Sequence, residues 1–251
     1  MNNQALTQFL LHVGDSQLIL SHRLLEWCGH APELELDIAL SNIGLDLLGQ
    51  ARTVLSLAGQ IEDLGRDEDK LAFFRTEREY RNLLLCEQPN VDFAQTMVRQ
   101  WLMDHYHILL LDALSQSSHA DIAAFGVKSL KEAKYHLRFS NAWMERLSLG
   151  TDEAHHKTQQ ALDNLWRFTA ELFELTADEQ ALVDSGVLPK LDTLKAEWSA
   201  QVESELVRLN LTLPENGAYR RGAKQGAHTE HLGYILAEMQ YMQRTYPNMN
   251  W

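Results

Sequence analysis

The sequence has little cysteine, little proline and no long uninterrupted apolar run. Its two cysteines, Cys28 and Cys86, exclude a disulfide framework and favour a reducing compartment. No window approaches the roughly 18 to 20 apolar residues that a membrane-spanning helix requires. The N-terminal residues MNNQALTQF lack the basic start and apolar run of a secretory signal. We therefore expect a cytoplasmic protein that does not enter a membrane.

Basic residues are also in deficit. Lysine and arginine total 22 against 35 aspartates and glutamates, which gives a formal net charge of −13. A surface of that sign repels nucleic acid and acidic membranes, so we expect neither as a partner. An anionic ligand would need a locally basic patch. The apolar fraction of 45% is typical of a folded globular chain rather than a disordered one.

What the sequence does have is helical spacing of apolar residues. The five prolines fall between long segments in which apolar residues recur at steps of three and four. Strict alternation over the length of a strand is rare, so the sequence predicts an all-α chain. The predicted helices cover residues 15–28, 33–59, 92–115, 121–149, 155–175, 193–209 and 229–246.

The connections between these helices predict a ferritin-like four-helix bundle. A short link at 29–32 makes an antiparallel hairpin of the first two helices, and a link at 115–120 makes a second hairpin. A long crossover at about 60–91 lies between the hairpins. Two hairpins joined by one long crossover are typical of the ferritin-like arrangement, and the plain up-down bundle is the alternative.

The sequence predicts one domain over residues 1–251. No internal repeat, low-complexity tract or linker interrupts it. The core bundle would span about residues 15–149. Additional C-terminal helices at about 153–246 would pack around that core.

A ferritin-like bundle can hold a di-iron site. That site takes a Glu from each of two helices and a Glu-x-x-His pair from each of the other two. Residues three apart lie on one helix face, so both members of a pair reach the same metal. Reflection across the two hairpin turns gives the positions where these ligands would stand. They are Asp15, Asp46, Gly49, Asp104, Ala133 and His136.

Both Glu-x-x-His pairs are therefore broken. The second helix has Asp46-x-x-Gly49, and the fourth has Ala133-x-x-His136, so only one of two histidines remains. We interpret these positions as a polar network in a helical core, whose groups satisfy one another without metal. We expect no metal and no other cofactor in this chain. The alternative is a self-sufficient di-iron oxidase or oxygenase, with Glu132 as an added ligand beside His136.

Five long runs of sequence carry a family resemblance. They are EWCGHAPELELDIALSNIGLDLLGQAR at 26–52, LLLCEQPN at 83–90, KEAKYHLRFS at 131–140, LWRFTAELF at 165–173 and HTEHLGYILAEMQYMQR at 228–244. Together they resemble the C subunits of the bacterial 1,2-phenylacetyl-CoA epoxidases, the ring-oxygenating complexes of phenylacetate catabolism. The resemblance covers nearly the whole chain.

The resemblance implies a ferritin-like, non-catalytic structural subunit. Its partner would be a homologous catalytic A subunit that holds the di-iron centre. Such a complex activates dioxygen and epoxidises the aromatic ring of phenylacetyl-CoA, with electrons from a separate reductase. Phenylacetyl-CoA would then lie at the interface between the subunits. An isolated acyl-CoA-binding helical module is a further alternative.

The crossover contains a candidate site for coenzyme A. Its phosphates need positive charge or helix N-termini. Arg75, Arg78 and Arg81 recur at three-residue spacing and would roughly align on a helix. We predict substrate contacts near Arg75 and Arg78, and at Thr76 and Glu77 between them. Because acidic residues accompany these arginines, a solvated, self-neutralised helix is the alternative.

Two further segments are candidates for anion contact. A capping box begins a helix and offers backbone N–H groups, so we predict substrate contacts at Thr176, Ala177 and Asp178. In the alternative it is only a cap. The loop at 219–228 holds basic residues and no acid, which favours an anion cradle or a clamp on an acidic partner. Its basic residues are Arg220, Arg221 and Lys224.

Overall fold

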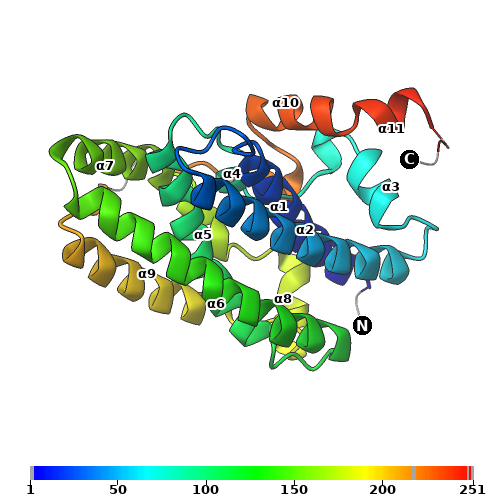
Figure 1. The fold of residues 1–251 in the computed structure, drawn as a ribbon. Coiled ribbons are helices and arrows are strands. Elements are labelled where there is room, and N and C mark those ends of the chain that lie inside the picture. Colours follow the sequence, from blue (N-terminus) through cyan, green and yellow to red (C-terminus); the bar gives the residue numbers. More distant parts are fainter. Residues whose placement is uncertain (1–2, 216–218, 248, 250–251) are drawn as a thin grey trace. The chain divides into compact units, whose positions relative to one another are not determined.

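The computed structural model describes residues 3–215, 219–247 and 249, and these residues form helices and loops without a strand (Figure 1). The all-α prediction is confirmed. The α-helices are α1 (Asn3–Leu25), α2 (Leu34–Glu62), α3 (Glu68–Phe73), α4 (Leu84–Glu87), α5 (Phe93–Leu114), α6 (Ala120–Leu149), α7 (Asp152–Trp166), α8 (Ala177–Asp184), α9 (Leu191–Arg208), α10 (Glu230–Met239) and α11 (Tyr241–Thr245). Short 3₁₀ helices are η1 (Glu77–Glu79), η2 (Thr169–Phe173) and η3 (Ala223–Gln225).

The chain divides into two compact units. Unit 1 comprises Met1–Pro89 and Gly222–Trp251, and unit 2 comprises Asn90–Arg221. Each unit contains one long helical hairpin, α1–α2 in unit 1 and α5–α6 in unit 2, and the long crossover runs between them in the sequence. This is the ferritin-like connectivity that the sequence predicted. The single domain over residues 1–251 stays a prediction.

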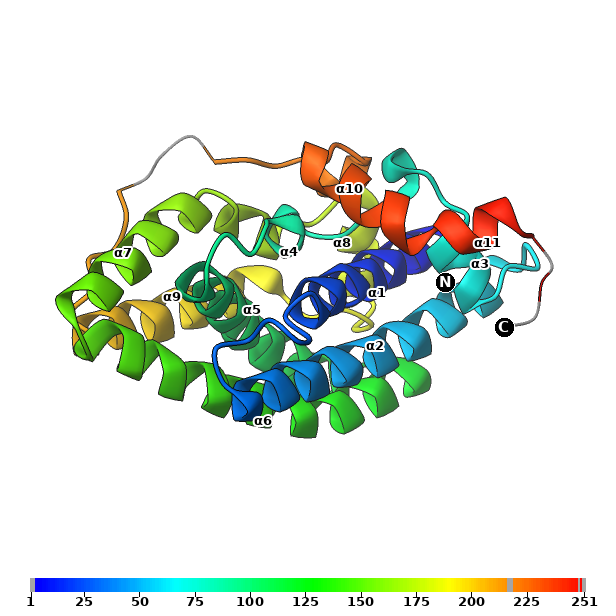
Figure 2. The ribbon, with the colours of Figure 1, turned by 45° about the horizontal axis from the view of Figure 1, so that its top comes forward.

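The hairpin of unit 1 is held by a close approach of α1 and α2, which lie side by side in Figure 2. The Ser21 hydroxyl on α1 donates a hydrogen bond of 2.6 Å to the carbonyl oxygen of Gly44 on α2. A Cβ at Gly44 would lie 2.9 Å from Cγ of Leu25, so glycine lets the helices approach closely. The stripe of α2 that is buried includes Leu36, Leu40, Ile43, Leu47 and Val54.

The crossover of unit 1 is covered by the C-terminal helices α10 and α11. The amide of Gln240, between these helices, donates to the carbonyl oxygens of Ala72 at 2.9 Å and Arg75 at 3.0 Å. Arg244 on α11 donates to the carbonyl oxygens of Phe74 and Arg75. These bonds satisfy backbone carbonyls in the last turn of α3 and just beyond it.

A buried carboxylate joins α4 to the start of α10. Glu87 accepts hydrogen bonds from the backbone N–H and the hydroxyl of Thr229, at 2.6 and 2.7 Å. Its other oxygen lies 2.9 Å from Nδ1 of His228, whose Nε2 lies 3.0 Å from the Tyr80 carbonyl oxygen. Burial lowers the pKa of His228, but the hydrogen bond and the charge of Glu87, together with the Tyr80 carbonyl and Asp15, raise it by more, so the net pKa is above the ordinary value. This pair brings together the two family runs at 83–90 and 228–244.

The hairpin of unit 2 packs against α7 and α9. The indole N–H of Trp198 on α9 donates to the Leu102 carbonyl oxygen on α5 at 3.3 Å. The ring of Trp198 also stacks on Trp166 with centroids 5.7 Å apart. Within the hairpin, a Cβ at Gly126 would lie 2.8 Å from the carbonyl oxygen of Leu111, so α5 and α6 meet closely there. α5 is therefore buried on nearly all sides.

The boundaries of several helices differ from those predicted. α1 begins at Asn3, well before residue 15, and the sequence did not reveal this start because most residues from Ala5 onward are buried and no single apolar stripe marks the helix. The predicted helix at 155–175 ends as an α-helix at Trp166 and continues as η2. The predicted helix at 229–246 is divided at Gln240. Within the described residues, no helix is both long enough and apolar enough to span a membrane.

Candidate functional site

A buried ion pair of unit 1 lies at one of the expected di-iron positions. Asp15 on α1 is fully buried, and both of its carboxylate oxygens accept hydrogen bonds from the guanidinium of Arg75. The bond from Nη1 of Arg75 to Oδ2 is 2.9 Å long. The backbone N–H of Arg81 donates to the same oxygen at 2.8 Å. The Asp15 carboxylate is therefore occupied by an internal cation and a backbone amide.

The surrounding residues fix the Arg75 guanidinium in place. Its Nε donates to the Leu71 carbonyl oxygen at 2.5 Å, and its Nη1 also donates to the Glu79 carbonyl oxygen at 3.1 Å. Its guanidinium carbon lies 4.5 Å from the centre of the Tyr80 ring. Burial lowers the pKa of Arg75, but the Asp15 carboxylate and other neighbours raise it by more. The guanidinium is therefore a permanent cation whose donors are used within the chain.

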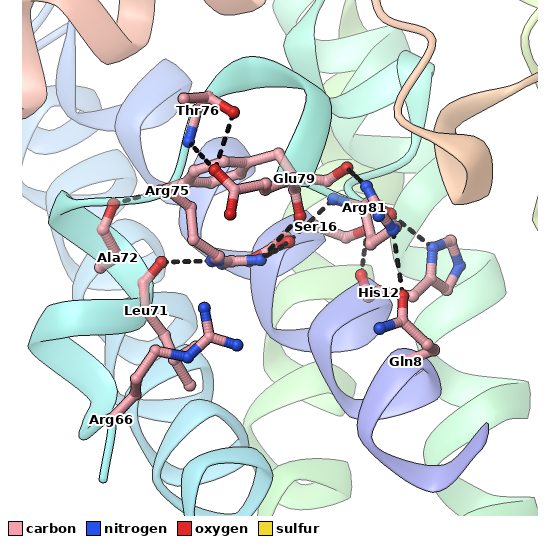
Figure 3. A network of polar contacts seen from close by, with 12 residues as sticks. Gln8, His12, Ser16, Arg66, Leu71, Ala72, Arg75, Thr76, Glu79 and Arg81 are labelled. Atoms are coloured by element: carbon pink, nitrogen blue, oxygen red, sulfur yellow. Dashed lines mark hydrogen bonds and ion pairs between the residues drawn. The ribbon is translucent and has the colours of Figure 1, made fainter. Parts of the chain in front are cut away.

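The loop that carries Arg75 is built around two local bonds. The Glu79 carboxylate accepts from the backbone N–H of Thr76 at 2.8 Å and from its hydroxyl at 2.7 Å, which closes η1 into a tight turn. On α1, Nδ1 of His12 lies 2.7 Å from the Arg81 carbonyl oxygen. Burial lowers the pKa of His12 to about 3, and the charge of Lys224 adds to that shift. The neutral imidazole therefore donates from Nδ1 (Figure 3).

The partner positions on α2 offer little to a metal. Asp46 is half-buried, whereas Gly49 is exposed and has open space where a side chain would stand. Because Gly49 has no side chain and Asp15 is already paired, unit 1 holds no set of free ligands at these positions. Within the part of the chain that the structure describes, no three His, Cys, Asp or Glu side chains form a group that could hold a metal ion. The residues at these positions do not fit a di-iron centre.

Unit 2 compensates its buried carboxyl group differently. Asp104 on α5 is fully buried and accepts a hydrogen bond of 2.7 Å from the amide of Gln100. Burial raises the pKa of Asp104 to about 8, against smaller opposing contributions from hydrogen bonds to Ser140 and Gln100. The carboxyl group is therefore mostly protonated at neutral pH, and a protonated acid is a poor metal ligand.

The expected di-iron positions on α6 also lack a set of ligands. Ala133 and His136 are buried, so a methyl group stands where a ligating carboxylate would be needed. Burial lowers the pKa of His107 on α5 to about 3, and the nearby His136 contributes to that shift. Glu132, the added ligand of the alternative interpretation, is half-buried on α6. The absence of a metal and of any other cofactor nevertheless stays a prediction.

A groove of about 630 Å³ lies beside the crossover in unit 1. Its first wall is the loop Thr76–Arg78, which contains three of the predicted substrate-binding residues. Its second wall is formed by α10, α11 and the residue between them. The residues of that second wall are Gly233, Leu236, Ala237, Gln240, Tyr241, Arg244 and Thr245. The structure therefore brings the crossover residues together with a segment that sequence reasoning did not connect to them.

The three crossover arginines do not align on a helix. The segment forms the short η1 followed by extended backbone, so successive side chains point in different directions. Arg78 is exposed and lines the groove, while Arg75 is buried against Asp15. Arg81 is half-buried and donates from Nε to the Gln8 side-chain oxygen at 3.1 Å. The alignment expected from three-residue spacing is wrong, and the contact of Arg75 with substrate stays a prediction.

The sequence of the second wall contains a pattern that indicates a close neighbour. Gly233, Ala237 and Tyr241 recur every four residues, and the small pair leaves room above the crossover. A Cβ at Gly233 would lie 2.5 Å from Oε1 of Glu77, so the side chain of Glu77 occupies that space. A pair of small residues on an otherwise apolar helix is a typical sign of a close neighbour.

The other predicted contact residues lie elsewhere. In unit 2, Thr176 caps α8, accepting from the Glu179 backbone N–H at 3.2 Å and donating its own N–H to the Glu179 carboxylate at 2.7 Å. The predicted capping box is confirmed, and Ala177 and Asp178 after it are exposed. Substrate contact at these three residues stays a prediction.

The basic loop at 219–228 is divided between the units. Arg220 and Arg221 belong to unit 2, and Lys224 belongs to η3 of unit 1. Arg221 forms an ion pair of 2.6 Å with Glu174, and the backbone N–H of Arg220 donates to the Arg167 carbonyl oxygen. Their role as partner or anion contacts stays a prediction.

Comparison with known proteins agrees with the resemblance that the five sequence runs indicated. The sequence model described as "Phenylacetic acid catabolic protein" matches residues 1–251. The C subunit of the 1,2-phenylacetyl-CoA epoxidase of Escherichia coli (strain K12) is 53% identical over 246 residues, which is 98% of this chain and 99% of that protein. The chain belongs to the phenylacetic acid catabolic protein family.

Proposed function

We propose that this chain is the structural, non-catalytic C subunit of a multicomponent di-iron monooxygenase. That complex would epoxidise the aromatic ring of phenylacetyl-CoA in the cytoplasm. The homologous catalytic A subunit would hold the di-iron centre, and a separate reductase would supply electrons. The identity of 53% to the C subunit of the E. coli epoxidase, over nearly the full length of both chains, supports this assignment.

The observation that carries the proposal is the pairing of Asp15 with Arg75. A buried carboxylate must be compensated, and in a di-iron protein the metal supplies the positive charge. Here the bidentate guanidinium supplies it and uses both carboxylate oxygens. Iron would have to displace a fixed, permanently charged side chain to bind at this position.

The remaining positions support the same proposal. Gly49 and Ala133 provide no donor atoms, and the pKa of Asp104 is raised to about 8 by burial. A self-sufficient di-iron oxygenase would need these positions to supply charged ligands. The chain would instead keep the shape of its catalytic homologue and contribute packing surface to it.

As part of the same proposal, Thr76, Glu77 and Arg78 contact the CoA portion of phenylacetyl-CoA that the catalytic partner mainly holds. Within the described residues, the exposed side chain of Arg78 makes no ion pair, so its charge is free for a phosphate. The groove beside it also presents Tyr241 and Arg244. Arg75 belongs to the same proposed substrate site, and its guanidinium also holds the base of the loop on Asp15.

The remaining contacts complete the proposal for the complex. The N-terminus of α8, at Thr176, Ala177 and Asp178, would contribute a second contact with substrate. Arg220, Arg221 and Lys224 would meet an anion or an acidic face of a partner. The exposure of Ala177, Asp178 and Arg221 supports these assignments.

The test is reconstitution of the complex with and without this chain. We expect that the catalytic A subunit and the reductase epoxidise phenylacetyl-CoA only when this chain is present, and that the chain alone does not. Epoxide formation by this chain and the reductase without the A subunit would overturn the proposal. So would full activity of the A subunit and reductase in the absence of this chain.

A further inference from the structure

The helix α2 is apolar on two opposite faces. One face is buried within unit 1. The other is open and carries large aliphatic side chains that are well exposed. These are Leu34 (72% exposed), Ile38 (53%), Leu45 (57%) and Leu48 (38%). Contiguous exposed apolar surface on one helix face is typical of an interaction site rather than of ordinary surface.

The spacing of the exposed residues is that of a helix-pairing seam. Leu34, Ile38, Ser41, Leu45 and Leu48 follow one another at steps of four, three, four and three. These steps place a residue at each successive a and d position from Leu34 to Leu48, where side chains interlock with a facing helix. With a rise of about 1.5 Å per residue, the seam is about 21 Å long. The partner of such a seam is an α-helix.

The charged residues beside the seam indicate what charge the partner helix should carry. From Leu34 to Ala51, α2 carries no lysine, arginine or histidine. Glu33 and Glu35 are exposed at its start. The first base, Arg52, forms an ion pair with Glu68 at 3.1 Å. A facing helix with an apolar stripe and basic flanks would therefore complement α2 in both respects.

A second copy of this chain complements it poorly. In a parallel pair, two α2 helices would bring their acidic starts together, and in either orientation the pair would join two chains that each have a net charge of −13. The matching helix of the other hairpin, α6, exposes Val127, Tyr135 and Leu149, but these are eight or more residues apart and the exposed residues between them are mainly charged. Its exposed bases are Lys128, Lys131, Lys134, Arg138 and Arg146.

We propose that the outer face of α2 docks a basic-flanked α-helix of the catalytic A subunit. This inference rests on the proposed function, which supplies the partner. The apolar seam would provide the buried centre of the interface, and the acidic start of α2 would provide its polar rim.

The proposal is tested by measuring the affinity of this chain for the purified A subunit. The double variant Ile38→Lys/Leu45→Lys interrupts the seam and places positive charge against the basic flanks. We expect its Kd for the A subunit to rise about 100-fold or more. The matched control is Val207→Lys on α9, which changes an aliphatic residue that is 76% exposed. We expect the control to bind within about twofold of the parent chain.

Two further variants keep the test independent of folding. Ile38→Gln/Leu45→Gln removes the apolar groups without charge, and the melting temperature should not fall because these side chains are exposed in the free chain. Glu35→Lys should weaken binding about fivefold and reduce its dependence on salt. Normal binding by both double variants would overturn the proposal.

The remaining outcomes separate this inference from the proposed function. If the parent chain does not bind the A subunit at all, the proposed function itself fails. If the parent chain binds and the seam variants bind equally well, only the docking face is wrong. If the parent chain instead self-associates and the seam variants are monomers, a second copy occupies the face and the assignment to the A subunit is overturned.

Discussion

Asp15 in unit 1 and Asp104 in unit 2 are both fully buried carboxyl groups, and the chain compensates them in different ways. Asp15 lies against the permanent cation of Arg75, which reaches it from the crossover. Asp104 has no such cation, and burial raises its pKa to about 8, so that a proton neutralises it. In a di-iron protein one metal cluster would serve both halves. This chain shows two other ways to keep an acid in a helical core.

The first way to break the comparison is to remove the cation from Asp15. Arg75→Met leaves the carboxylate buried without its partner, so we expect the free energy of unfolding to fall by about 3–5 kcal/mol. Urea denaturation measures this loss. Arg75→Met combined with Asp15→Asn removes both charges, and we expect it to recover a large part of the stability. A loss below about 1 kcal/mol for the single variant would show that Asp15 does not depend on Arg75.

The second test of the comparison is to remove the titratable carboxyl group of Asp104 from unit 2. Asp104 has a folded pKa above its unfolded pKa, so its favourable contribution is complete below about pH 4 and is lost as the pH rises through about 8. Asp104→Asn keeps the hydrogen-bonding shape without the titration. Relative to the parent chain, we expect this variant to gain about 5 kcal/mol of stability between pH 4 and pH 8, because about four pH units separate the unfolded and folded pKa values of Asp104. Urea titrations at both pH values measure the difference, and a pH-independent difference would contradict the assignment.

The third test of the comparison removes a hydrogen bond to a protonated acid rather than a charge. Gln100→Leu deletes the amide that donates to Asp104 at 2.7 Å. We expect a loss of about 1 kcal/mol, smaller than the loss at Arg75, because one partner remains neutral by protonation. The same substitution should raise the pKa of Asp104 further, which NMR titration of its carboxyl carbon would detect. A loss as large as that of Arg75→Met would erase the contrast between the two acids.

The fourth test compares the buried Arg75 with the exposed Arg78. Arg78→Glu should change the free energy of unfolding by less than about 0.5 kcal/mol, because Arg78 is exposed and makes no ion pair among the described residues. It should weaken binding of phenylacetyl-CoA to the assembled complex about tenfold at low salt. Arg138→Glu on α6 changes the same charge at another exposed position and is the control. Equal affinity of both variants for phenylacetyl-CoA would remove Arg78 from the substrate contact.

The sequence predicted the long helices well because their buried stripes are regular. α2, α6 and α9 fall close to their predicted ranges, and so does α5, although it is buried on nearly all sides. The start of α1 was missed for the opposite reason. The residues from Phe9 to Ser21 are buried without a break, so no polar face reveals the period of this helix. The short α4 has only four residues, which is too few for a periodic pattern.

The degenerate ligand positions were also predicted from spacing alone, but their partners were not. Arg75 is sixty residues from Asp15, and nothing local in the sequence indicates that the two meet. The three-residue spacing of the crossover arginines indicated a shared helix face, whereas the Thr76–Glu79 bonds fold that segment into a 3₁₀ turn. Long-range pairing and turn geometry decided this site, and neither leaves a period in the sequence.

The most direct test of the account is the iron content of the purified chain after expression in iron-supplemented medium. Metal analysis and Mössbauer spectroscopy report how much iron is bound and whether it forms a pair. We predict no di-iron spectrum and iron far below one atom per chain, both for the parent chain and for Asp104→Asn. Two iron atoms per chain with the spectrum of a coupled pair would contradict the central claim that Arg75 and a proton have taken the place of the metal.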